Sequence, residues 1–567
     1  MSRYLLLLCC SFGTLCLSHS AHGEVKEFVE HAGTGPFGIP GEEADMAVFD
    51  EEEEWTRVDI SCSFMILGVF FFNIVIFYMV NYPDDDIKRY SWSIINTTVS
   101  IFSAVMIFTA ADEVVLHFVF NPLLGEFPAG WHLVVRVVLS YIIFLLWFTC
   151  AQIMIAYFSN ALKRRGLQGE VEEGESPGRA WVVNDGLRGD HGQPIDPTLV
   201  THDGRERSIA IVGGVEVFVM TKDLAKQGFE QRTKCWSMLY AHMAGFAMIS
   251  AGGDLQHAWP FASSALMSFL SVALNVVFLL LLFRFSKMLR PDAEESDDEE
   301  GAEAVKLCEE HAIEAEDELF NLSISFLLVQ AVRYAVTGVL STKSGAEPGE
   351  DFGLWEIASV YSLAMIMVVV TIAVALSGHT RRLADLVRGT CSMAFAWCLL
   401  FASRWMFESW DMLVKHGVSP ATIEGRLLLA LFLSALAAFA IILLDKIEDT
   451  STNQRLAHKV VKNFVTGLSI LIGFTWEHVV DGCTEAVASI YHEHEVQRLV
   501  SKVVGAAIIA LVVLPAWRRH VLQTVMMLMK HKKEKRVAER LAQMVGGNAD
   551  KIEPSSSEES ADASLAW

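Results

Sequence analysis

Carboxylate and imidazole side chains occur together at the end of one long apolar stretch of this sequence. Glu477, His478 and Asp481 follow the apolar run, and Glu477 and Asp481 are four residues apart, so that on a helix they share one face. When two carboxylates lie close together, the charge of one raises the pKa of the other. Such a pair beside a histidine is suited to relaying protons or small cations.

A second group of charges lies inside other apolar stretches. Arg404 and Glu408 are four residues apart and can pair on a helix, and Arg333 lies within a further apolar run. Arg333, Arg404 and Glu477 lie about thirteen to eighteen residues from the start of their helices, roughly two-thirds of a ~30 Å hydrocarbon core or somewhat more. Charges at that depth cost on the order of 2.5–3.5 kcal/mol each, so they need partners or water. We expect Glu408 to pair with Arg404, and Glu477 with Arg333, around one shared cavity.

Carboxylates near the ends of two other apolar runs extend this pattern. Asp112 and Asp254 lie where a membrane helix would reach the surface. Acids gathered at one mouth concentrate cations there. The sequence therefore predicts an ion path containing Asp112, Asp254, Glu408, Glu477, His478 and Asp481, with Arg333 and Arg404 as counter-charges. A set of structural ion pairs that hold the helices in register is the competing interpretation, since such pairs also contain one charge of each sign.

The metal-binding residue types show no ligand spacing. His492, Glu493, His494 and Glu495 are adjacent, and neighbouring side chains diverge on a helix or strand, so at most two of them could bind one metal ion. The cysteines form no CxxC pair. The sequence predicts no metal ion and no cofactor.

The elements that would position these residues are membrane helices. Of 567 residues, 52% are hydrophobic, and nearly uncharged runs of about 18 residues or more are long enough to cross a bilayer. The pattern predicts an all-α, polytopic membrane helix bundle over residues 61–517, with about eleven spans arranged as successive hairpins. The predicted spans are Ser61–Val80, Trp92–Ala111, Leu133–Phe158, Trp236–Gly253, Phe261–Phe285, Leu319–Leu340, Trp355–Gly378, Leu386–Phe407, Leu427–Leu444, Phe464–Val480 and Val496–Trp517.

Lysine and arginine indicate the orientation of these spans. Basic residues concentrate in every second loop, as in Lys88-Arg89, Arg381-Arg382 and Arg518-Arg519, and such loops face the cytosol. The sequence therefore predicts an extracytosolic N-terminus and a cytosolic C-terminus. The predicted location is a multi-pass protein of the secretory pathway, in the plasma membrane or an endomembrane.

The N-terminal region has the pattern of a signal peptide. Arg3 precedes the apolar stretch from Tyr4 to Leu17, and small residues surround Gly23, which predicts a signal peptide over residues 1–23. A signal anchor that stays in the membrane is the alternative. Residues 24–60 are rich in acids, glycine and proline and are interpreted as a solvated extracytosolic spacer.

Two long cytosolic loops and a tail are also predicted. The loop over 160–234 contains β-branched residues on both sides of Gly213-Gly214, which predict a small hairpin, and the loop over 287–318 ends as a charged helix. The tail, 518–567, begins with a basic amphipathic helix. Such a helix suits anionic lipid or a calmodulin-type partner, and an ordinary basic stop after the last span is the alternative.

The net charge and the absence of a protease motif argue against two classes of function, nucleic-acid binding and intramembrane proteolysis. A net charge of −24 disfavours nucleic acid as a partner. Ala251 to Asp254 departs from the Gly-x-Gly-Asp pattern of intramembrane aspartyl proteases and has no evident partner aspartate, so no enzyme is predicted. We expect a transporter or channel for a small cation, with H⁺ as one candidate, that opens to an outward-facing acidic vestibule. A non-transporting receptor or scaffold is the alternative.

Overall fold

The computed structural model describes most of the predicted helical region. The described residues are 57–125, 127–128, 131–159, 161, 208–212, 215–219, 222–290, 299–342, 352–377, 382–415, 418–451, 454–488, 495–530 and 532. The predicted signal peptide, residues 24–56 of the acidic segment, His492 to His494, and the tail from residue 533 onward lie outside the described residues.

Helices make up nearly all of the described structure. They are α2 (Arg57–Val80), α3 (Asp85–Val115), the π-helical η1 (Leu116–Phe120), α4 (Asn121–Gly125), α5 (His132–Phe158), α6 (Lys222–His257), η4 (Phe261–Ser263), α7 (Ala265–Leu289), α8 (Glu299–Thr337), α9 (Leu354–Leu376), α10 (Arg382–Glu408), α11 (Asp411–Lys415), α12 (Ile423–Thr450), α13 (Gln454–Ala488), α14 (Glu495–Ala516) and the π-helical η7 (Trp517–Leu522). The all-α prediction is confirmed.

The predicted hairpin is also present. Strands β1 (Ser208–Val212) and β2 (Val215–Val219) pair antiparallel, with Val212 opposite Val215.

The chain forms two compact units. The first comprises Met1–Phe148, Leu239–Phe285 and Glu316–Val521, and the second comprises Thr149–Met238, Ser286–Ala315 and Leu522–Trp567. In the second unit, the indole of Trp236 stacks on the ring of Phe158. The side chains that carry the argument below belong to the first unit.

Helix boundaries follow local sequence signals. The Asp84 side chain accepts hydrogen bonds from the backbone N–H groups of Asp86 and Ile87 and so begins α3. Thr422 begins α12 in the same way through the N–H of Gly425. These caps fix where the polar ends of the two helices start.

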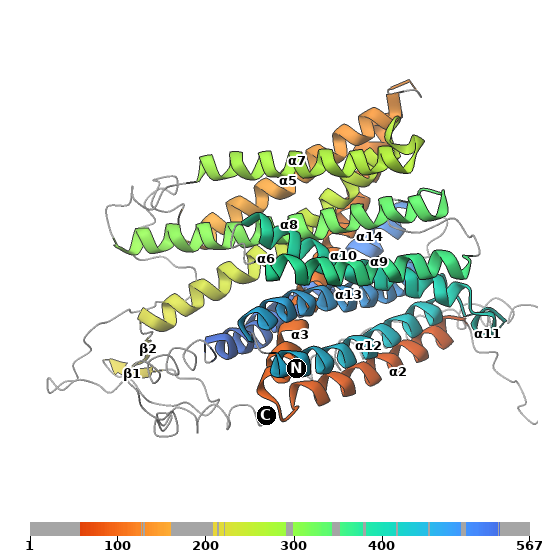
Figure 1. Ribbon diagram of the computed structural model, residues 1–567. Helices are drawn as coiled ribbons and strands as arrows, with labels where there is room; N and C mark the ends of the chain where they lie inside the picture. Colours follow the sequence, from red (N-terminus) through yellow and green to blue (C-terminus); the bar gives the residue numbers. More distant parts are fainter. Residues whose placement is uncertain are drawn as a thin grey trace, which may run out of the picture. The chain divides into compact units, whose positions relative to one another are not determined.

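α13 lies at the centre of the first unit and packs against α3, α10 and α12, while α2 runs alongside α12 (Figure 1). Gly467 on α13 allows the close approach of α10, because a Cβ atom at this position would lie 2.6 Å from the carbonyl oxygen of Ser392. The side chains of Trp397 and Phe474 meet edge to face nearby. As a result of this close packing, polar side chains of α13 such as Ser469, Thr475 and Glu477 are buried inside the protein.

Among the described residues, eight helices are long and apolar enough to cross a membrane. These candidate spans are Asp85–Gly125, His132–Phe158, Ala265–Leu289, Ala304–Thr337, Leu354–Leu376, Arg382–Glu408, Ile423–Thr450 and Val496–Lys530. The protein is thus a multi-pass membrane protein. α2, α6 and α13 contain the other three predicted spans. The described apolar part of α2, Ile66–Val80, is shorter than the eight candidate spans. α6 and α13 contain buried charged groups, such as Asp254 and Glu477. The count of eleven and the orientation remain predictions.

Candidate functional site

The C-terminal half of α13 carries the carboxylate–imidazole pair of Glu477 and His478. Glu477 is only 3% exposed, and its Oε2 atom lies 3.0 Å from Nδ1 of His478. The guanidinium of Arg426, near the start of α12, donates a hydrogen bond to the backbone oxygen of His478 at 3.1 Å. α12 therefore holds this turn of α13 from the side.

Asp481 lies one turn further along α13, beyond the end of the predicted span. Burial and the charge of Glu477 raise the pKa of Asp481 above its ordinary value, against the opposing charges of His478, Lys502 and Arg426. The two carboxylates thus interact electrostatically as their four-residue spacing predicts. A group of this kind can hold a proton at a higher pH than an exposed aspartate does.

A network of ion pairs continues this site onto α3 and α14. The ammonium of Lys502 donates a hydrogen bond to Glu113 at 2.7 Å and also pairs with Glu485, which binds Arg498. Burial acts to raise the pKa of Glu485, but the hydrogen bonds and charges of Lys502 and Arg498 outweigh burial and lower it. We call Glu477, His478, Asp481, Arg426 and Lys502 the α13 C-terminal cluster.

The arginine side chains form a separate group between α8 and α10. Nε of Arg404 lies 3.2 Å from Oε1 of Glu408, which confirms the predicted pair. Arg333 is 1% exposed, its guanidinium carbon lies 3.7 Å from the ring centroid of Phe401 and 5.5 Å from that of Trp405, and it interacts electrostatically with Arg404 and Glu408. Such cation–π contacts stabilise a guanidinium most strongly where water is excluded.

The expected pair of Arg333 with Glu477 is replaced by this arrangement. Glu477 forms its hydrogen bond with His478 on its own helix, and Arg333 lies against the aromatic rings of α10. Six of the eight predicted residues are therefore divided between the α13 C-terminal cluster and the group of Arg333, Arg404 and Glu408, and Asp112 and Asp254 lie in neither.

Asp254 belongs to a third group, among α5, α6 and α7. Its carboxylate is buried, accepts a hydrogen bond from the hydroxyl of Ser140 at 2.6 Å, and lies 3.2 Å from Nε of Arg136. Nearby, the hydroxyl of Tyr141 donates to Asn275. Asp112 lies one turn before the end of α3, and its backbone oxygen accepts from the N–H of Leu116.

A second carboxylate–imidazole pair lies at the opposite end of α13. Nδ1 of His458, on the first turns of α13, is 2.9 Å from Oε1 of Glu448, on the last turn of α12. The hydroxyl of Tyr90 on α3 donates to the other oxygen of Glu448. Glu448 is buried, so three helices meet around one carboxylate.

A third such pair lies fully inside the first unit. His242 on α6 is 0% exposed, and its Nε2 atom lies 2.9 Å from Oε1 of Glu318 on α8. Its Nδ1 atom lies 3.1 Å from the hydroxyl of Ser100 on α3. Both ring nitrogens are therefore hydrogen-bonded, which fixes the ring and lets the pair share or exchange a proton.

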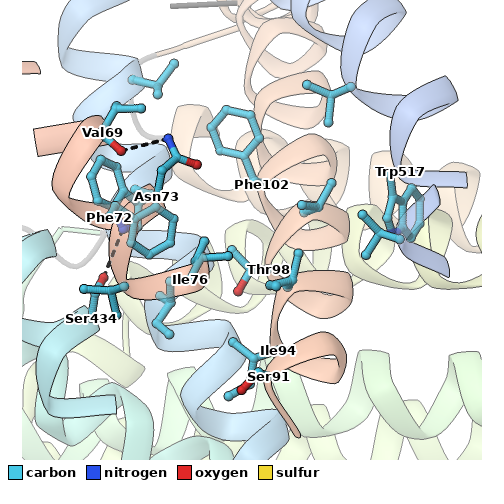
Figure 2. Close-up of a pocket in the computed structure, with 18 of the residues that line it drawn as sticks. Val69, Phe72, Asn73, Ile76, Ser91, Ile94, Thr98, Phe102, Ser434 and Trp517 are labelled. Carbon is cyan, nitrogen blue, oxygen red and sulfur yellow. Dashed lines mark hydrogen bonds between the residues drawn. The ribbon is translucent and has the colours of Figure 1, made fainter. Parts of the chain in front are cut away.

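The described cavity in this unit is apolar. A space of about 280 Å³ lies between α2, α3, α12, α13 and the π-helical turn η7 (Figure 2). Figure 2 shows Phe72, Ile76 and Ile94 around it. Its few polar groups are bonded to neighbours: Ser434 accepts from the indole N–H of Trp476, and Asn73 donates to the backbone oxygen of Val69. The residues that line it include no Asp, Glu, Lys or Arg, so it is shaped for hydrocarbon rather than for an ion.

The sequence reasoning missed the pairs of His458 and His242. Glu448 and His458 both lie in the segment between the predicted spans Leu427–Leu444 and Phe464–Val480, so the hairpin arrangement itself could have brought them together. His242 had no such signal, because its partners Ser100 and Glu318 are far away in the chain. No family model, curated protein or solved structure matches this chain.

Proposed function

We propose that this protein transports a small cation across its membrane, and that H⁺ is the cation its geometry favours. One observation carries the proposal: near each end of α13, a histidine of this helix is hydrogen-bonded to a carboxylate, that of Glu448 on α12 at one end and that of Glu477 on α13 at the other. His458 and His478 are twenty positions apart in one helix, which corresponds to about 30 Å, the thickness of a hydrocarbon core. Each pair is therefore suited to exchange protons at one membrane surface.

The helices around α13 support a path between these two pairs. α3 packs against α13 and contributes Ser100 to the buried pair of His242 and Glu318. Histidine and carboxylate groups are the side chains that most readily take up and release protons near neutral pH. Under the predicted orientation, Glu477 faces the extracytosolic side and Glu448 faces the cytosol.

The acids at the extracytosolic end fit the predicted vestibule. Glu477, Asp481, Glu485 and Glu113 lie on α13 and α3 around Lys502. Four carboxylates against Lys502, Arg498 and Arg426 leave a net negative charge at the mouth, which attracts cations. The vestibule is thus formed at α13 rather than at Arg333.

A scaffold remains the second candidate because of the group between α8 and α10. Arg404 pairs with Glu408 on its own helix, and Arg333 lies against Phe401 and Trp405. These contacts join two helices without reaching the α13 C-terminal cluster. We assign this group a structural role in either case, so that Arg333→Leu should lower stability without a specific effect on transport.

Proton flux in reconstituted vesicles tests the proposal. The purified protein is placed in liposomes that contain a pH-sensitive dye, and an imposed K⁺ diffusion potential drives H⁺ entry. We expect the wild-type protein to acidify the lumen and Glu477→Gln, which keeps the size and one hydrogen-bond acceptor of the side chain, to slow acidification about tenfold or more. Asp411→Asn on α11 removes an exposed carboxylate and is the matched control, expected to behave as wild type.

The folded state of each variant must be the same for this comparison. Elution as a single species and an unchanged melting temperature establish it. Equal acidification by wild type, Glu477→Gln and protein-free liposomes would contradict transport of protons. The same vesicles loaded with Na⁺ or K⁺ indicators then test whether another small cation moves, and no flux of any of them would favour the scaffold.

A further inference from the structure

Three aspartates that are far apart in the sequence meet at one end of the bundle. Asp84 lies in the link between α2 and α3, and Asp445 and Asp449 lie on the last two turns of α12. One oxygen atom from each of them falls within 4.8 Å of the others. An ion with oxygen ligands at about 2.3–2.6 Å can contact atoms separated by up to about 5 Å, so one Ca²⁺ can reach all three.

Asp445 supplies an independent indication of a ligand. It is only 5% exposed, and its carboxylate forms no hydrogen bond or ion pair with the described residues. The charged groups that act on it are the carboxylates of Asp84, Asp449, Asp86 and Glu448. A bound cation would balance the charge of a buried carboxylate that lies among other carboxylates.

The neighbouring basic and imidazole groups are already bound elsewhere. Arg89 pairs with Asp86, and His458 pairs with Glu448. Two of the four surrounding carboxylates thus have partners in the protein. The other two, Asp84 and Asp449, are the ones whose oxygens converge with an oxygen of Asp445.

The position of Asp445 and Asp449 in α12 is electrostatically unfavourable in two further ways. Asp445 and Asp449 are four residues apart, where like charges repel along a helix. They also lie near the helix C-terminus, whose partial negative charge disfavours carboxylates, and the last turn of α12 contains no basic residue. A bound cation would offset both interactions.

We propose that Asp84, Asp445 and Asp449 bind one divalent cation, Ca²⁺ in preference to Mg²⁺. Carboxylate oxygens are the ligands of hard cations, and water completes the coordination because Asp84 is partly exposed and Asp449 is exposed. Asp84 uses one oxygen to cap α3, which leaves the other for the ion. The ion therefore fastens the start of α3 to the end of α12.

Calorimetry tests this site. The full-length protein is purified in detergent and freed of metal with a chelator, and separate samples are titrated with CaCl₂ and with MgCl₂. We expect one saturable Ca²⁺ site per chain and weaker Mg²⁺ binding. Asp445→Asn and Asp449→Asn should each weaken Ca²⁺ binding at least about tenfold. Asp84→Asn should do so while preserving the helix cap, because asparagine caps as well as aspartate.

Thermal unfolding keeps the test decisive if a variant binds poorly for other reasons. In chelator, Asp445→Asn should melt at or above the wild-type temperature, because it removes a buried charge among like charges. Added Ca²⁺ should raise the melting temperature of wild type and of the control Asp411→Asn, but not that of Asp445→Asn. No saturable Ca²⁺ binding by wild type, or equal Ca²⁺ effects on wild type and Asp445→Asn, would overturn the proposal.

Discussion

His458 of α13 lies 2.9 Å from the carboxylate of Glu448, across the short link that joins α12 to α13. Tyr90 of α3 donates to the same carboxylate, so this contact also joins α3, which is distant in the sequence, to the hairpin of α12 and α13. Its geometry repeats that of Glu477 and His478 near the other end of α13. The repetition on one helix is what favours proton movement over a single structural pair.

Replacing Glu448 tests whether both ends of α13 are needed. Glu448→Gln preserves acceptance of a hydrogen bond from Tyr90 but removes the proton-accepting carboxylate. Proton flux should therefore fall at least about tenfold, as in Glu477→Gln. The measurement is dye acidification in the same vesicles, with Tyr90→Phe as a control for loss of the hydrogen bond alone. Full flux in Glu448→Gln would exclude this end of α13 from the path.

The raised pKa of Asp481 gives stability a predictable dependence on pH. Because the folded-state pKa exceeds the unfolded-state pKa, the folded protein binds more protons between the two values. The contribution of Asp481 to stability is then present at low pH and is lost as pH rises through the folded-state pKa. Asp481→Asn should remove this loss, so the variant should gain stability relative to wild type as pH increases from acid to neutral.

Unfolding of wild type and of Asp481→Asn by a denaturing detergent, at a series of pH values, measures the difference between their free energies of unfolding. Glu485→Gln is the opposing control, because the pKa of Glu485 is lowered and its contribution is lost as pH falls. The two variants should therefore resemble wild type at low pH and diverge from it in opposite directions as pH rises to neutral, Asp481→Asn gaining and Glu485→Gln losing stability. Parallel pH profiles for wild type and Asp481→Asn would contradict the assigned environment.

Lys502 should stabilise the junction of α3, α13 and α14. Its ammonium binds Glu113 and Glu485, and its side chain is 13% exposed. Lys502→Met leaves both acids without this partner and should lower the free energy of unfolding by about 1–2 kcal/mol, since the acids themselves are partly hydrated. Arg498→Met should cost less, because the Arg498–Glu485 pair is more exposed. Equal losses in the two variants would contradict this ranking.

The sequence predicted the helices well because hydropathy and helix caps act locally. It located the charged residues along each helix, as the pair of Arg404 and Glu408 illustrates. It did not specify how each helix is rotated about its axis, and that rotation decides which neighbour a side chain meets. This is why Glu477 was assigned to Arg333, whereas its hydrogen bond is with His478.

Contacts between distant segments could not be predicted from the sequence either, because they too depend on how each helix is rotated and packed. Most of the helical region lies between Asp84 and Asp445 in the sequence. Neither aspartate has another potential metal-binding residue at the spacing of a known metal motif. Only the packing of helices around α3 brings their oxygens together. His242 and Glu318 meet through α6 and α8 in a similar way.

The apolar cavity offers a test of where the ion path lies. Its lining comes from the side of α13 that includes Ile472, Trp476 and Val479, whereas the proposed path uses Glu477 and His478 on another part of the helix surface. Ala438→Phe should fill part of the roughly 280 Å³ space and leave proton flux in vesicles unchanged, since hydrocarbon groups line the cavity. Stability should rise by up to about 1 kcal/mol if the ring fits, or fall by about 1–3 kcal/mol if it overfills the space. Leu443→Phe, at an exposed position of α12, controls for added aromatic surface. Loss of flux in Ala438→Phe alone, with normal folding, would place the path through the cavity and remove it from the carboxylate–imidazole pairs.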